Sequence, residues 1–145
     1  MPKSEQIVCP FCRAVNRVPT DRPASAARCG GCHEALFSGR PAEVNEADLD
    51  RHLRSDSIPI LLDVWAPWCG PCRTMAPQFA KAAETLEPGV RLLKLNADEA
   101  QATCGRLGVR GIPALFLFRH GKPIAQSAGA MGAEAIVKWA RGNLT

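Results

Sequence analysis

The sequence predicts an α/β domain in which helices cover a mixed sheet, with a small cysteine-rich module in front of it. An apolar strand at 58–66, a helix after Cys72 and a second strand at 90–95 form a crossover that implies parallel strands. A third apolar strand, 114–118, turns back into 123–127 as an antiparallel hairpin. The front module is indicated by four cysteines in two Cys-x-x-Cys pairs.

The other elements follow from short-range signals. We expect a short strand at residues 42–44, and Asn45 is a good N-cap for a helix that runs to about Ser55. Residues 100–107 predict a short helix. Residues 133–141, with apolar positions at helical spacing, predict a closing helix. Helices and strands therefore alternate along most of the chain, which is typical of an α/β domain.

Length and composition limit the class of protein. The chain has 145 residues, of which 46% are hydrophobic and 22% charged, as in an ordinary globular protein. The net charge of +4 comes from basic residues that are scattered, so we expect no nucleic-acid partner. No apolar run is long enough to span a membrane, and Met1–Gln6 lacks the apolar stretch of a signal peptide. We therefore expect a cytoplasmic monomer with no membrane partner.

The two front cysteine pairs predict a metal site. Cys9 and Cys12 are separated by 16 residues from Cys29 and Cys32, a spacing typical of a four-cysteine zinc site. The first 40 or so residues contain too few apolar side chains to fold without a staple, which zinc would supply. Two disulfides or four idle thiols remain the alternatives. His33, which follows Cys32, is expected to be solvated.

The third pair lies where a buried strand meets a helix. Cys69 would sit at the helix start, where free amides and the helix dipole favour a thiolate, and Cys72 would lie one turn inside. Two such thiols form a reversible two-electron switch. We expect Cys69 to be the exposed, attacking thiol. Asp63 interrupts the apolar strand, so its burial should raise its pKa; the alternative is an Asp that meets solvent or a backbone donor.

Three motifs in order resemble the thioredoxin family. Residues 63–72 read DVWAPWCGPC, residues 94–98 read KLNAD, and residues 109–113 read VRGIP, with Gly129 further on. The resemblance covers about residues 42–145. The front cysteine pairs, joined to such a domain, resemble the thioredoxin 2 subgroup. The resemblance implies a thioredoxin fold, a central mixed β-sheet flanked by helices, preceded by a zinc-ribbon-like module.

The resemblance also implies a function. It implies a thiol–disulfide oxidoreductase that reduces protein disulfides through Cys69 and Cys72 and is recycled by thioredoxin reductase and NADPH. The partners are then the reductase and client proteins with disulfides. The chain would divide into a zinc-binding module, 1–38, and a thioredoxin domain, 39–145. One structural zinc per chain is expected, and no tightly bound organic cofactor.

Roles for individual residues come from the same resemblance. Asp63 would help to deprotonate the resolving thiol, and Lys94 would tune Asp63. The Ile112–Pro113 peptide bond would be cis and would place the Ile112 backbone beside the sulfurs. The catalytic set is Cys69, Cys72, Asp63 and Lys94. The set that contacts substrate is Trp68, Gly70, Pro71, Gly111, Ile112, Pro113, Gly129 and Ala130.

Other functions and roles remain open. A zinc-dependent redox sensor or holdase chaperone would oxidise the front cysteines and release the metal. A structural subunit of a larger complex would not need Cys69. Cys104, the seventh cysteine, is expected to be packed or idle rather than regulatory. His52 and His120 are expected at the surface.

Overall fold

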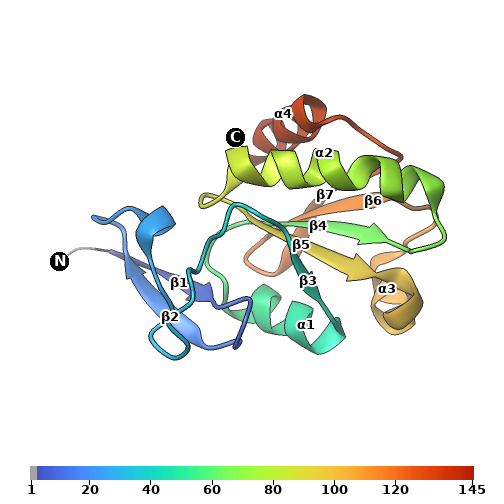
Figure 1. Ribbon diagram of the computed structural model, residues 1–145. Coiled ribbons are helices and arrows are strands. Elements are labelled where there is room, and N and C mark those ends of the chain that lie inside the picture. Colours follow the sequence, from blue (N-terminus) through green and yellow to red (C-terminus); the bar gives the residue numbers. More distant parts are fainter. Residues whose placement is uncertain (1–2) are drawn as a thin grey trace.

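The computed structural model describes residues 3–145 and contains one large and one small sheet (Figure 1). In spatial order, the first three strands of the large sheet run parallel to one another. Each of the last two runs antiparallel to the strand before it. This confirms the predicted crossover, the predicted hairpin and the mixed sheet. The five strands, in spatial order, are β3 (Ala42–Val44), β5 (Arg91–Asn96), β4 (Ile60–Trp65), β6 (Ala114–Arg119) and β7 (Lys122–Ala128).

Helices cover both faces of this sheet. Helices α2 (Gly70–Leu86) and α4 (Ala133–Leu144) lie on one face, above the sheet in Figure 1. Helices α1 (Glu46–Ser55) and α3 (Gln101–Leu107) lie on the other, and a 3-10 turn, η2 (Ala97–Glu99), leads into α3. No helix in the described part of the chain is long and apolar enough to cross a membrane.

The two faces of the sheet form two separate cores. Side chains alternate along a strand, so neighbouring residues of β4 enter different cores. Both cores consist of buried apolar side chains, so the central strands are apolar almost throughout. Leu61, Leu92 and Leu115 pack with α2 and α4, whereas Leu62, Leu93 and Phe116 lie in the core on the side of α1 and α3.

Local chemistry explains some of the helix ends, whereas contacts with another helix explain others. The Asn45 side chain caps α1 by accepting a 2.7 Å hydrogen bond from the Asp48 backbone amide, as predicted. Gly108 ends α3 in the left-handed conformation, with φ of 71°. Helix α4 has no cap of its own. The Gln78 side chain of α2 caps it instead, accepting a 3.0 Å bond from the Ala133 amide.

The front module is more ordered than the sequence predicted. Residues 13–28 have the prolines and charged side chains of a loop, but they contain strand β2 (Val15–Pro19), which pairs antiparallel with β1 (Ser4–Val8), and a 3-10 turn, η1 (Ala24–Ala26). The apolar pattern of β2 is too weak to predict a strand, because hydrogen bonds to β1 rather than a buried face hold β2 in place. The module's own core is small: Ile7, Cys9, Val18, Cys29, Leu36 and Phe37.

The module packs against the end of the sheet at which β4 and β5 begin, beside the C-terminal end of α1 (Figure 1). The Ser57 amide donates to the Gln6 carbonyl over 2.9 Å, and Ile58 packs against the module core. This contact makes one prediction wrong. His52 is fully buried, with Nδ1 2.5 Å from Asp56 Oδ2, whereas His120 is exposed as expected.

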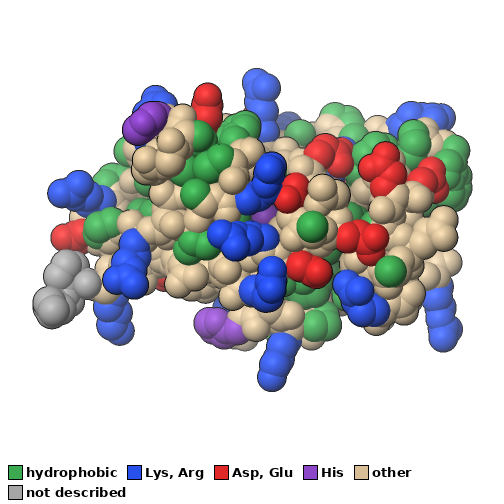
Figure 2. Space-filling model, turned by 90° about the horizontal axis from the view of Figure 1, so that it is seen from below, with side chains coloured by type: hydrophobic (Ala, Val, Ile, Leu, Met, Phe, Trp, Pro, Cys, Tyr) green, Lys and Arg blue, Asp and Glu red, His purple; other side chains and the backbone are tan. Residues whose placement is uncertain are grey.

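Charged side chains are dispersed over the face formed by α1, α3 and the module. Figure 2 shows Lys and Arg spread across this face with Asp and Glu among them. The net charge of +4 is therefore not gathered into one basic patch on this face.

Candidate functional site

The third cysteine pair lies where β4 leads into α2. Cys69 is the N-cap residue of α2 and is disulfide-bonded to Cys72, with a Cα–Cα distance of 5.3 Å. The Cys72 backbone amide donates to Cys69 Sγ over 3.2 Å. An amide at a helix start that donates to this sulfur favours a negative charge on Cys69 in the reduced protein.

Cys69 and Cys72 differ less in solvent exposure than predicted. Cys69 is only 5% exposed in the disulfide form, against 2% for Cys72. Cys69 packs against Ala66 and Ile112, which cover it. The surroundings do distinguish the two residues, because Cys69 Sγ lies 3.7 Å from the Ile112 carbonyl oxygen. The Ile112–Pro113 peptide bond is cis, as the resemblance implied.

A groove lies beside the disulfide. Trp68, Gly111 and Ile112 line a cavity of about 480 Å³. Trp68 is 67% exposed, and its indole N–H donates to both carboxylate oxygens of Asp98, each over 3.1 Å. The groove therefore has an apolar rim held in place from η2. Cys104 also lines it, a position that the sequence did not indicate.

The other residues predicted to contact substrate surround this site without lining the groove. The Gly129 amide donates to the Pro113 carbonyl over 2.9 Å, and its φ of 102° suits only glycine. Gly70 and Pro71 are exposed at the start of α2, and Ala130 is exposed next to Gly129.

Asp63 is the buried acid of the site. Its side chain is 0% exposed, and neither carboxylate oxygen has a hydrogen-bond partner among residues 3–145. Burial raises its pKa from 3.8 to about 7; Lys94 lowers this pKa and Glu43 raises it. The predicted direction of the pKa shift is confirmed. A carboxyl group that titrates near neutral pH is suited to exchange a proton during a reaction.

Glu43 belongs to the same group, which sequence reasoning missed. The register places Glu43, Lys94 and Asp63 in one row across β3, β5 and β4. Lys94 Nζ lies 3.8 Å from Glu43 Oε1 and 4.9 Å from the centre of the Trp65 ring. Glu43 and Asp63 therefore share the electrostatic attraction of the Lys94 ammonium group. No local signal reveals this, because only strand order makes Glu43 a neighbour of Lys94.

The front cysteines also come together. All four Sγ atoms lie within 4.8 Å of one another, with Cys9 and Cys32 3.6 Å apart and Cys12 and Cys29 3.5 Å apart. Tetrahedral zinc with bonds of about 2.3 Å requires sulfurs about 3.8 Å apart. A disulfide needs about 2.05 Å, so the pairs are not bridged. The donor set and its geometry therefore fit zinc.

The two turns that carry these cysteines have the same conformation. Arg13 donates from its amide to the Cys9 carbonyl, and His33 does the same to Cys29, each over 2.9 Å. Both Arg13 and His33 are left-handed, with φ of 66° and 67°. His33 is exposed at this turn position.

Backbone amides point at a sulfur in each of the two turns. Phe11 donates to Cys9 Sγ over 3.4 Å, and Gly31 donates to Cys29 Sγ over 3.3 Å. Hydrogen bonds lower the pKa of Cys29 to about 6. The largest contribution comes from the Cys32 backbone and the next from the Asn16 side chain. Donors of this kind stabilise metal-bound thiolates.

The fold and the Cys69–Cys72 site together define a class. A Cys-x-x-Cys disulfide at a helix start, faced by a cis-proline loop and carried on a mixed sheet, is the arrangement of thiol–disulfide oxidoreductases with a thioredoxin fold.

Comparison with known proteins gives the family. The thioredoxin family matches residues 40–142, and the thioredoxin 2 N-terminal family, a zinc ribbon, matches residues 8–34. Thioredoxin C-3 of Corynebacterium nephridii is 37% identical over 133 residues, which cover 92% of this chain and 91% of the relative. A thioredoxin of Haemophilus influenzae is 43% identical over 88 residues, 61% of this chain and 82% of the relative.

A solved structure agrees. A mutant thioredoxin from Halobacterium salinarum superposes with a TM-score of 0.67 at 29% identity, covering 75% of this chain and 95% of that one. The chain belongs to the thioredoxin family and carries the N-terminal zinc ribbon of thioredoxin 2. It is a protein-disulfide reductase of the thioredoxin type. The redox-sensor or holdase alternative finds no support in these relatives.

The raised pKa of Asp63 predicts how stability depends on pH. Between about pH 4 and pH 7 the folded protein holds a proton on Asp63 that the unfolded chain has lost, so stability falls as pH rises. Asp63→Asn should remove about 2–3 kcal/mol of the loss between pH 5 and pH 8. Urea unfolding of the oxidised protein at both pH values measures it. Equal pH dependence in variant and wild type would contradict the raised pKa.

Glu43 should affect the same titration. Replacing it by Gln removes a nearby negative charge and frees Lys94 to approach Asp63, and both changes lower the pKa of Asp63. We expect Glu43→Gln to lower that pKa by on the order of half a pH unit, followed by NMR of the Asp63 carboxyl carbon. Glu99→Gln is the control, because the exposed Glu99 acts on Glu43 but is not among the causes of the Asp63 shift. An unchanged pKa in Glu43→Gln would rule out the effect.

Proposed function

We propose that this chain reduces disulfides in client proteins with the Cys69–Cys72 dithiol and is recycled by thioredoxin reductase and NADPH. The observation that carries the proposal is the disulfide at the start of α2, where the Cys72 amide donates to Cys69 Sγ over 3.2 Å. We place this cycle in a cytoplasmic monomer, without nucleic-acid or membrane partners.

The order of attack follows from that hydrogen bond. The Cys69 thiolate attacks one sulfur of the client disulfide, whose S–S bond breaks, and the departing client thiolate takes a proton from water. Cys72 then loses its proton and attacks Cys69 Sγ, which closes the Cys69–Cys72 disulfide and expels the second client sulfur as a thiolate that takes a proton from water. Two electrons pass from the dithiol to the client, and the reductase returns two from NADPH.

Asp63 and Lys94 are assigned to the proton transfer in this cycle. Asp63 as a carboxylate accepts the proton that Cys72 loses, since its pKa of about 7 lets it gain and lose a proton near neutral pH. Lys94 favours the carboxylate form, because its ammonium group lowers the pKa of Asp63.

Client binding is assigned to the surface around the disulfide. The Ile112 backbone, held by the cis bond to Pro113 and lying 3.7 Å from Cys69 Sγ, is placed to pair with an extended client segment. Trp68 and Gly111 form one side of the groove. The exposed residues Gly70, Pro71, Gly129 and Ala130 complete the contact surface.

Single cysteine variants test the order of attack. Cys69→Ser should abolish disulfide reduction, because no thiolate is left to attack the client. Cys72→Ser should accumulate a mixed disulfide with the client, visible as a mass increase that a reducing agent reverses. Normal turnover by Cys72→Ser would show that the assigned order is wrong.

Recycling is tested with the full-length protein. NADPH oxidation is followed with thioredoxin reductase and insulin as the disulfide substrate. Oxidation that depends on the added protein and is lost in Cys69→Ser supports the proposal. Cys104→Ser is a matched control, because Cys104 lies in the neighbouring groove but outside the disulfide. Absence of NADPH oxidation with the wild type would exclude this reductase as the electron source.

We also propose that residues 1–38 form a module with one structural zinc, that residues 39–145 form the thioredoxin domain, and that no organic cofactor is tightly bound. The zinc ligands are Cys9, Cys12, Cys29 and Cys32. Their sulfurs fit a tetrahedral site, and zinc would supplement the small core of the module.

Metal analysis of the reduced, purified protein tests the site. About one zinc per chain is expected in the wild type, with loss of most of it in Cys12→Ser, while Cys104→Ser keeps it. A metal-free wild type would refute the zinc site.

A further inference from the structure

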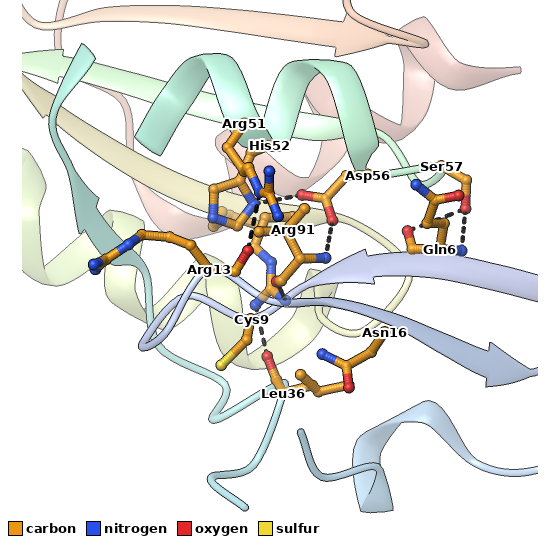
Figure 3. Close-up of polar contacts among 12 residues, drawn as sticks. Gln6, Cys9, Arg13, Asn16, Leu36, Arg51, His52, Asp56, Ser57 and Arg91 are labelled. Carbon is orange, nitrogen blue, oxygen red and sulfur yellow. Dashed lines mark hydrogen bonds and ion pairs between the residues drawn. The ribbon is translucent and has the colours of Figure 1, made fainter. Parts of the chain in front are cut away.

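A buried arginine of the thioredoxin domain lies at the junction with the zinc module. Arg91, the first residue of β5, is 1% exposed. Its Nη1 donates to the Leu36 carbonyl over 2.8 Å, and its Nη2 donates to the Val8 carbonyl over 3.2 Å (Figure 3). Its guanidinium also lies 4.2 Å from the centre of the Phe37 ring. One side chain of the large domain therefore contacts two carbonyl groups and one aromatic ring of the module.

These contacts lie at both ends of the metal site. Val8 directly precedes the ligand Cys9, and Leu36 follows the ligand Cys32 by four residues. A forked guanidinium that bonds both carbonyls ties the chain entering the first cysteine turn to the chain leaving the second. Arg91 therefore bridges the segments that carry the two turns.

Asp56 holds the first turn from another side. Its Oδ1 accepts a 2.7 Å hydrogen bond from the Val8 amide, and its Oδ2 lies 2.5 Å from His52 Nδ1 (Figure 3). Asp56 is 4% exposed and His52 0%. The thioredoxin domain therefore binds both the amide and the carbonyl of the residue before Cys9.

The charge on Arg91 is balanced inside the domain. Glu87 Oε2 lies 3.8 Å from Arg91 Nη1 and accepts a 3.2 Å hydrogen bond from the Leu92 amide. Removing one partner of a buried charge pair is costly, because the other charge stays desolvated. The domain thus maintains a charged group whose hydrogen bonds to backbone carbonyls all lie in the module.

We propose that Arg91 and Asp56 are positioning residues for the four-cysteine zinc site, so that zinc affinity depends on the thioredoxin domain and zinc in turn stabilises that domain. The inference rests on the zinc binding proposed above. The coupling is reciprocal by linkage: what the domain adds to zinc affinity, zinc adds to the stability of the domain. The module sits where β4 and β5 begin, and the disulfide follows the other end of β4, so the coupling acts on the fold rather than on the dithiol (Figure 1).

The first test uses the wild-type, full-length protein. The three tryptophans, Trp65, Trp68 and Trp139, all lie within the part matched by the thioredoxin family, so their fluorescence reports unfolding of that domain. Removing zinc with a chelator should lower the urea midpoint of the fluorescence transition. An unchanged midpoint would overturn the proposal, because a metal coupled to the domain must stabilise it.

The second test changes Arg91. Arg91→Lys keeps the positive charge but loses the fork that reaches two carbonyls. Its zinc dissociation constant, measured by competition with a chromogenic chelator, should rise about tenfold. Arg119→Lys is the matched control, because Arg119 also donates to a backbone carbonyl, that of Leu144 over 3.2 Å, on the exposed end of β6. Dissociation constants within twofold of each other in the two variants would overturn the proposal.

Asp56→Asn gives an independent variant if Arg91→Lys fails to fold. It keeps an oxygen acceptor for the Val8 amide but loses the charge, so zinc affinity should fall less than in Arg91→Lys, and an unchanged affinity would count against the proposal. The outcomes also separate the two proposals. A wild type that binds no zinc refutes the metal site itself. A wild type that binds zinc, with Arg91→Lys unaffected, refutes only the positioning role.

Discussion

Strand β4 is hydrogen-bonded on both edges, to β5 and β6, and covered by helices on both faces, and the site depends on that constraint. Contacts on four sides fix the position of this strand and therefore the positions of its side chains. Asp63 therefore stays buried, and Cys69 lies just beyond the end of the strand, at the start of α2. The loop before β6 brings Ile112 to the same place, because β6 is the neighbour of β4.

Two of the buried charged groups of this domain, Asp63 and Arg91, have opposite surroundings. Asp63 has no hydrogen-bond partner in the described chain, so its charged form is disfavoured and its pKa lies near neutrality. Arg91 has two carbonyls, an aromatic ring and a carboxylate around it, so its charge is supported where it stands. The unsupported charge is suited to proton exchange. The supported one is suited to joining two parts of the fold.

Much of the fold and site was predictable because the signals are local. Apolar runs marked the central strands, Asn45 marked the start of α1, and the segment around Cys69 and Cys72 marked a strand meeting a helix. The predictions failed where another part of the chain decides. His52 looks like a surface residue on an amphipathic helix, but the module covers that end of α1. Cys69 looks like an exposed helix cap, but Ala66 and Ile112 pack over it.

The sequence alone separated the three cysteine pairs, two in the front module and one where a strand meets a helix, because spacing and the adjoining strand or helix are local properties of the chain. It also placed an acid in the strand that leads to the redox pair. Only the tertiary structure decided that Glu43 shares Lys94 with Asp63, and that Arg91 and Asp56 hold the cysteine turns. These contacts join residues 31 to 83 positions apart, and they arise from strand order and domain packing. No pattern within a short stretch of sequence records either.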